Sequence, residues 1–183
     1  MQNQTSFLND VQEIRRRARL HMEEGAVTEG YRADRGTVLK LLNEALATEL
    51  VCVLRYKRHY YMARGIHAES VKKEFLEHAS EEQLHADRIA ERITQLGGEP
   101  DFNPAILSER SHSEYKEGGS LLDMVQEDLI AERIAIDSYK EMIDYIADAD
   151  PTTRRLFEEI LGTEEEHADD MSDILSALDP SRA

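Results

Sequence analysis

Six residues that could bind metal ions occur along this chain in two copies of one pattern, a glutamate followed by a distant Glu-x-x-His. The first copy is Glu49, Glu82 and His85, and the second is Glu132, Glu164 and His167. The lone glutamate precedes the Glu-x-x-His by 33 residues in the first copy and by 32 in the second. In a helical bundle, such a repeat builds a site with a pseudo-two-fold axis. Four carboxylates and two imidazoles there suit a pair of redox-active transition-metal ions.

The spacing and charge of these residues favour metal binding over a structural role. Residues three apart lie on one helix face, so Glu82 and His85 point the same way, as do Glu164 and His167. Four carboxylates buried together are strongly unfavourable unless cations offset their charge, which two divalent ions would do. A lone carboxylate in an apolar stripe usually reaches solvent or pairs with arginine, and a single Glu-x-x-His is common by chance. Two copies at nearly equal spacing predict a dinuclear site of iron or manganese.

Four long amphipathic helices are predicted to carry these residues, each with a metal-binding candidate on its apolar stripe. The predicted helices cover residues 37–64, 68–96, 120–147 and 151–178, with short turns near Gly65 and at 148–150. The connection 97–119 is long enough to run the length of a bundle. We therefore predict an all-α four-helix bundle (37–178) with one long crossover between its second and third helices. An N-terminal extension (1–36) with a short helix over Asp10–Glu24 precedes it, and a tail (179–183) follows.

The composition limits the classes of function. The 183 residues carry a net charge of −16, which opposes nucleic-acid binding over most of the surface and attracts cations. Cys52 is the only cysteine, so no disulfide can form within the chain. We find no apolar run that fits a signal peptide or a membrane span, and we expect a cytoplasmic protein with no membrane partner.

Four segments resemble the helix motifs of the ferritin-like di-iron carboxylate family, and in particular those of bacterioferritin. They are LNEALATELVCVLRYKRHY, EEQLHADRIAERITQLGGEP, DLIAERIAIDSY and EEILGTEEEHADDM. The resemblance implies two iron ions per subunit, with Glu82 and Glu164 bridging them. It also implies that Glu49 and Glu132 are terminal carboxylates and that His85 and His167 are the nitrogen ligands. Tyr56 matches a tyrosine that the family keeps beside the site, where a catalytic redox role is expected.

The chain also departs from bacterioferritin. Gln83 stands where bacterioferritins have a haem-binding methionine, so no haem is expected there. Only sixteen residues follow His167, too few for the fifth helix of 24-subunit shells. Together with the N-terminal extension, this resembles Dps-like proteins with a bacterioferritin-type site inside the bundle. We therefore expect a homo-oligomeric shell of twelve subunits in preference to twenty-four.

The function implied by the resemblance is a ferroxidase that oxidises Fe(II) with O2 or H2O2 and stores Fe(III) in the shell. The alternatives are a dimanganese catalase, a rubrerythrin-like peroxidase (disfavoured because no Cys-x-x-Cys is present) and a Dps-type shell that binds DNA. The basic run Arg15, Arg16, Arg17 and Arg19 motivates the DNA alternative, although an exposed helix face explains it better.

Other residues have possible accessory roles. His78 shares the inner stripe one turn before Glu82 and is a candidate for an accessory site. Glu77 and Glu81 are candidates for the wall of a shell interior. The position of Cys52, one turn after Glu49, fits an ordinary core residue.

Overall fold

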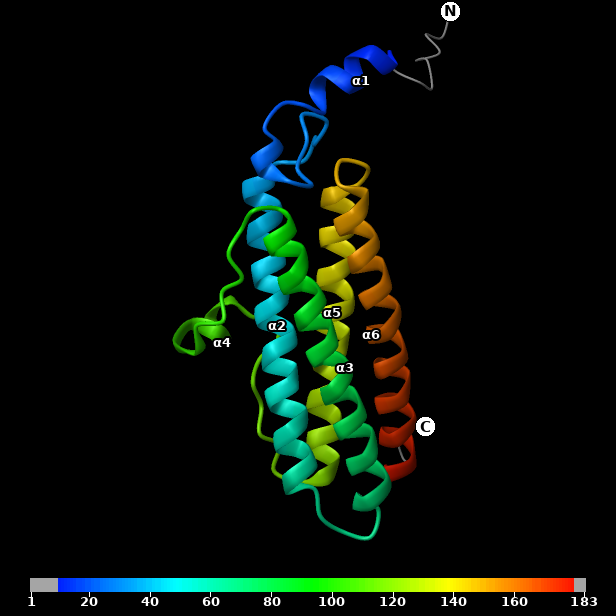
Figure 1. Cartoon of the computed structure of the whole chain (residues 1–183). Coiled ribbons are helices and arrows are strands. Elements are labelled where there is room, and N and C mark those ends of the chain that lie inside the picture. The colour runs from blue at the N-terminus through cyan, green and yellow to red at the C-terminus, as the bar shows by residue number, and fades with distance from the viewer. Residues whose placement is uncertain (1–9, 180–183) are drawn as a thin grey trace, which may run out of the picture.

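The computed structural model describes residues 10–179, and it contains helices and loops but no strand in that part of the chain (Figure 1). The α-helices are α1 (Val11–Arg17), α2 (Arg35–Met62), α3 (Ala68–Gln95), α4 (Leu107–Arg110), α5 (Leu121–Ile146) and α6 (Pro151–Leu178), and two 3-10 turns are η1 (Met22–Glu24) and η2 (Pro104–Ile106). The four long helices lie side by side as two hairpins, α2 with α3 and α5 with α6 (Figure 1). The predicted all-α bundle is confirmed. Residues 1–9 of the predicted extension and the predicted tail after Asp179 lie outside the described residues.

Capping side chains define where three of the four long helices, α2, α5 and α6, begin. Asp34 accepts a hydrogen bond from the backbone N–H of Thr37, and Ser120 accepts one from that of Asp123. Asp150 caps α6 through the N–H of Thr153, and Pro151 occupies the first turn as its sequence predicts. Because these caps are local in sequence, the helix boundaries agree with the predicted ones to within about two residues.

The connection between α3 and α5 follows α2 along its length. Its backbone meets α2 side chains in order: the Asp101 N–H donates to Asn43, the His112 N–H donates to Thr48, and the Glu114 carbonyl accepts from Arg55. Further along, His59 Nε2 lies 3.1 Å from the Lys116 carbonyl oxygen. The predicted crossover therefore spans the bundle, and it includes the short η2 and α4 segments that the sequence did not predict.

The N-terminal helix is shorter than predicted. It ends at Arg17, because His21 adopts a left-handed backbone conformation (φ 49°) that an α-helix cannot continue through. The loop that follows is tied to the turn between α5 and α6. Within it, the Tyr31 hydroxyl donates to Asp150 over 3.0 Å and Arg32 donates to the Asp148 carbonyl over 2.7 Å.

The apolar core of the described residues is divided into two large clusters and a small third one of Ala47, Val51 and Leu107. One large cluster lies around Leu42, Ile89 and Phe157, and the other around Phe75, Val125 and Met171. The buried glutamates and histidines of the repeat occupy the middle of the helices between them. None of the helices within residues 10–179 offers an apolar stretch that could cross a bilayer.

Candidate metal centre

All six residues of the repeat converge in the interior of the bundle. They form two groups whose potential ligand atoms lie within 4.8 Å of one another: Glu49, Glu82, His85 and Glu164, and Glu82, Glu132, Glu164 and His167. The two groups share Glu82 and Glu164, one carboxylate from α3 and one from α6. Each group adds one terminal glutamate and one histidine. Two cation positions joined by two shared carboxylates therefore fit the arrangement.

Both histidines turn the same ring nitrogen inward. His85 Nδ1 lies 3.1 Å from Glu164 Oε1 and 3.2 Å from Glu49 Oε2. His167 Nδ1 lies 3.6 Å from Glu82 Oε1, while its Nε2 lies 2.7 Å from Glu81 Oε2. A carboxylate on the far nitrogen fixes the ring and directs the near nitrogen at the site. Glu81, which we predicted to face a shell interior, thus orients His167. Glu77 is exposed and lies 3.9 Å from Lys73.

The four carboxylates are almost fully buried, and several of their oxygens make no hydrogen bond. Glu82 Oε1, Glu132 Oε2, both oxygens of Glu164 and His167 Nδ1 are buried without a hydrogen bond. Burial without a partner costs about 1–3 kcal/mol for a polar group and more for a charged one. A folded protein rarely keeps so many such atoms in one place, and cations would satisfy all of them.

The crowding also changes the pKa values of these groups. Burial, followed by the charge of Glu82, raises the pKa of Glu49 to about 8. The pKa of Glu164 is raised well above its usual value, by burial and by the other three glutamates. Burial opposes ionisation of His85, but its contacts with Glu49 and Glu82 outweigh this and raise its pKa to about 10. Without metal, the cluster is therefore held together by shared protons, which divalent ions would displace.

Two tyrosines extend the repeat beyond the six residues. The Tyr56 hydroxyl donates to Glu132 Oε1, and the Tyr139 hydroxyl donates to Glu49 Oε1, so each half of the chain supports the terminal glutamate of the other. Tyr139 follows Tyr56 by 83 residues, the same separation as between Glu49 and Glu132. Sequence reasoning identified Tyr56 and did not single out Tyr139. The 83-residue separation was the signal that could have identified it.

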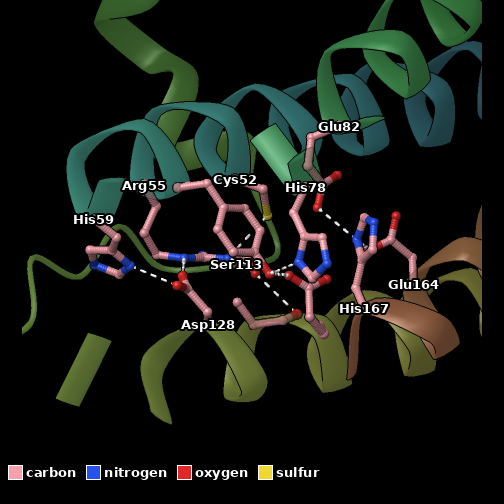
Figure 2. A network of polar contacts seen from close by, with 12 residues as sticks. Cys52, Arg55, His59, His78, Glu82, Ser113, Asp128, Glu164 and His167 are labelled. Carbon is pink, nitrogen blue, oxygen red and sulfur yellow. Dashed lines mark hydrogen bonds and ion pairs between the residues drawn. The ribbon is translucent and has the colours of Figure 1, made fainter. Parts of the chain in front are cut away.

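A buried polar network adjoins the site (Figure 2). Arg55 Nε donates to Asp128 Oδ1 over 2.7 Å, and His59 Nδ1 lies 2.7 Å from Asp128 Oδ2. The guanidinium also lies 4.0 Å from Glu132 and 3.5 Å from the Cys52 sulfur. Burial raises the pKa of the Cys52 thiol well above its usual value, so Cys52 behaves as the core residue we predicted.

His78 lies against the site, as its place on the inner stripe suggests. Its ring stacks on that of His167 with centroids 3.9 Å apart, and its Nδ1 is 3.2 Å from the Tyr56 hydroxyl (Figure 2). His78 belongs to neither of the two groups that share Glu82 and Glu164.

Comparison with known proteins gives relatives of two kinds. The bacterioferritin of Rhodobacter capsulatus is 29% identical over 143 residues, which are 78% of this chain and 84% of that protein. The nutrient stress-induced DNA-binding protein of a Nostoc species is 32% identical over 130 residues, 69% of this chain and 71% of that protein. The predicted resemblance to bacterioferritins and Dps-like proteins is confirmed.

A solved structure shares the fold over a similar span. It is the bacterioferritin-related protein of Bacteroides fragilis, described as a dodecameric thioferritin. It matches with a TM-score of 0.78 and 30% identity over 82% of this chain and 91% of its own. The family model of the ferritin-like domain matches residues 39–180, from the first turn of α2 to beyond the end of α6. Because that match takes in the whole bundle, this chain belongs to the ferritin-like family.

Proposed function

We propose that this protein is a ferroxidase that oxidises Fe(II) at the dinuclear site inside the bundle and stores the Fe(III) product in a homo-oligomeric shell. The observation that carries the proposal is the pair of overlapping ligand groups that share Glu82 and Glu164, together with their buried oxygens that make no hydrogen bond. Membership of the ferritin-like family supports the same function. The substrate is then Fe(II), with two ions per subunit, and the oxidant is O2 or H2O2.

The residues of the site suit this chemistry. Glu82 and Glu164, which belong to both groups, would bridge the two ions, while Glu49 with His85 and Glu132 with His167 would complete the two positions. Four carboxylates stabilise Fe(III) relative to Fe(II), because the higher charge gains more from the same negative ligands. Each ion then supplies one electron to a two-electron oxidant. With H2O2, two Fe(II) and two protons give two Fe(III) and two water molecules, and with O2 the product is H2O2.

Tyr56 and Tyr139 contribute by holding the terminal glutamates. Each hydroxyl fixes one oxygen of Glu132 or Glu49 and leaves the other oxygen for an ion. Tyr56 is placed between Glu132 and His78, and its phenol is the group we propose for the catalytic redox role. Burial, with the nearby charge of Glu132, raises its pKa well above the usual value, so the phenol keeps its proton.

Rapid mixing of Fe(II) with the aerobic protein tests this proposal. Glu82→Ala or Glu164→Ala should abolish most of the fast oxidation, because each change removes a carboxylate from both positions. Glu77→Ala is the matched control, since Glu77 lies on α3 near Glu82 but is exposed. Equal rates in all three variants would reject the site. Metal analysis of protein purified without added metal separates iron from the dimanganese catalase alternative.

We propose a shell of twelve subunits, because the related Bacteroides fragilis protein is described as dodecameric. Large apolar side chains that are about half exposed on the long helices, among them Leu54, Leu84 and Ile130, fit contacts between subunits. Twelve chains of 21.0 kDa give about 250 kDa. Native mass spectrometry checks this figure, and a mass near twice as large would indicate a 24-subunit shell.

DNA binding remains the alternative, and relatives such as the Nostoc protein are named for it. In this chain, however, two arginines of the N-terminal basic run are paired with an acidic residue of the same helix: Arg16 bonds to Glu13, and Arg17 lies 3.6 Å from it. A gel-shift at physiological salt with and without the first 25 residues tests the alternative. Loss of a shifted band on deletion would support it.

A further inference from the structure

A third group of metal-binding side chains lies beside the dinuclear site. Glu74 and His78 of α3 and Asp170 of α6 each place one ligand atom within 4.8 Å of the others. His78 is only 2% exposed, whereas Glu74 is partly buried and the Asp170 side chain is 57% exposed. The group thus reaches from solvent to the ring that stacks on His167.

The hydrogen bonds of Tyr56 determine which nitrogen of His78 faces this group. The Tyr56 hydroxyl donates its single proton to Glu132, so towards His78 it can only accept. His78 Nδ1, 3.2 Å from that oxygen, must therefore carry the proton and donate. In the neutral ring the lone pair is then on Nε2, which lies 3.5 Å from Asp170 Oδ2.

This tautomer brings three acceptors together. The Nε2 lone pair comes from a buried ring, and the other two acceptors are the carboxylates of Glu74 and Asp170. Asp170 Oδ2, 3.5 Å away, is the atom that Nε2 faces. An acceptor aimed at a carboxylate is unfavourable unless a cation lies between them. Imidazole and carboxylate are also the donor types of each dinuclear position, and the two negative charges of Glu74 and Asp170 balance one divalent ion.

We propose that Glu74, His78 and Asp170 bind a third divalent transition-metal cation, on the solvent side of the dinuclear site. Three protein ligands leave coordination positions open to water, which suits an ion that is exchanged and not retained. The site would hold Fe(II) next to His167 before the ion moves inward. This role as a loading position rests on the proposed ferroxidase function, but the binding of the cation does not.

Isothermal titration of the metal-free protein with Co(II) under argon tests the binding. We expect one fewer tight Co(II) per chain in Asp170→Asn than in Asp169→Asn, a matched control that removes the same charge from the neighbouring exposed position. The double variant Glu82→Ala/Glu164→Ala should retain the third ion and lose the other two. Equal stoichiometry in the two aspartate variants would overturn the third site.

The same titration keeps the two proposals separate. A double variant that binds as many ions as the unchanged protein would reject the dinuclear site and leave the third site unaffected. For the loading role, the initial rate of Fe(II) oxidation at limiting Fe(II) should fall severalfold in Asp170→Asn, with the same total iron oxidised. An unchanged initial rate, with the third ion lost, would reject the loading role.

Discussion

Replacing Tyr139 with phenylalanine tests whether the pseudo-two-fold repeat extends beyond the six metal-binding candidates to a tyrosine that contributes to metal affinity. The change removes one hydroxyl and leaves the buried ring. In the metal-free protein Glu49 has a pKa of about 8 and is mostly protonated at pH 7, so Tyr139 donates to a neutral group. With a divalent ion bound, Glu49 is ionised and accepts the same hydrogen bond as a carboxylate.

The expected loss of affinity is the difference between these two hydrogen bonds. A hydrogen bond to a charged group contributes about 1.5–3 kcal/mol and one to a neutral group about 0.5–1.5 kcal/mol. Tyr139→Phe should therefore weaken metal binding by about 1–1.5 kcal/mol, or about five- to twelvefold. Tyr56→Phe should also weaken metal binding, through Glu132, whose pKa is raised by burial and by Glu82.

Anaerobic Co(II) titration measures both affinities, and Tyr145→Phe on the same helix is the control because Tyr145 is exposed. If Tyr139→Phe binds Co(II) as tightly as the control while Tyr56→Phe does not, the two tyrosines are not equivalent. In that case the extension of the repeat to the tyrosines is wrong.

Three further predictions concern stability and protons. Asp150→Ala should lower the free energy of unfolding by about 3–5 kcal/mol, because Arg92 donates twice to Asp150 in a buried pair and would lose its carboxylate partner. Urea denaturation, with the exposed Asp148→Ala as control, measures this loss. Metal affinity should rise between pH 6 and pH 8, by up to about tenfold per pH unit for each proton displaced, because the raised pKa of His85 makes the proton compete with the metal ion. Calorimetry in two buffers counts the displaced protons, and an affinity independent of pH would contradict this prediction. Mn(II) should raise the melting temperature of the unchanged protein, and it should raise that of the Glu82→Ala variant much less. Differential scanning calorimetry of each protein, with Mn(II) and after treatment with a chelator, measures the two shifts.

The six residues that converge could be predicted from the sequence, because their positions on the inner faces of the helices follow from their spacing along each helix. Glu82 and His85 are three residues apart, and any helix long enough to carry them brings them to one face. The caps at Ser120 and Asp150 are equally local, and the helix starts were predicted within about two residues for that reason.

The polar network around Arg55 could not be predicted in the same way. An arginine on an apolar stripe usually reaches solvent, and Arg55 is buried only because Asp128 of α5 meets it across the bundle. That pairing depends on the register between two helices, and the paired residues are 73 positions apart in the chain. The early end of α1 could not be predicted either. It is associated with a positive φ at His21, and nothing about a histidine at that position requires such a conformation.

The network also makes the two halves of the repeat chemically different. At the separation of 83 residues, Ser138 corresponds to Arg55 and Ala45 corresponds to Asp128, so no second guanidinium stands beside Glu49. The two ion positions therefore experience different electric fields although their ligands are the same. Identical halves would leave a singly loaded protein as an equal mixture of two isomers, whereas this inequality selects one of them. If the proposed site binds two ions, we therefore expect a preferred order of filling, and a mixed pair of metals would occupy it with each ion in its own place.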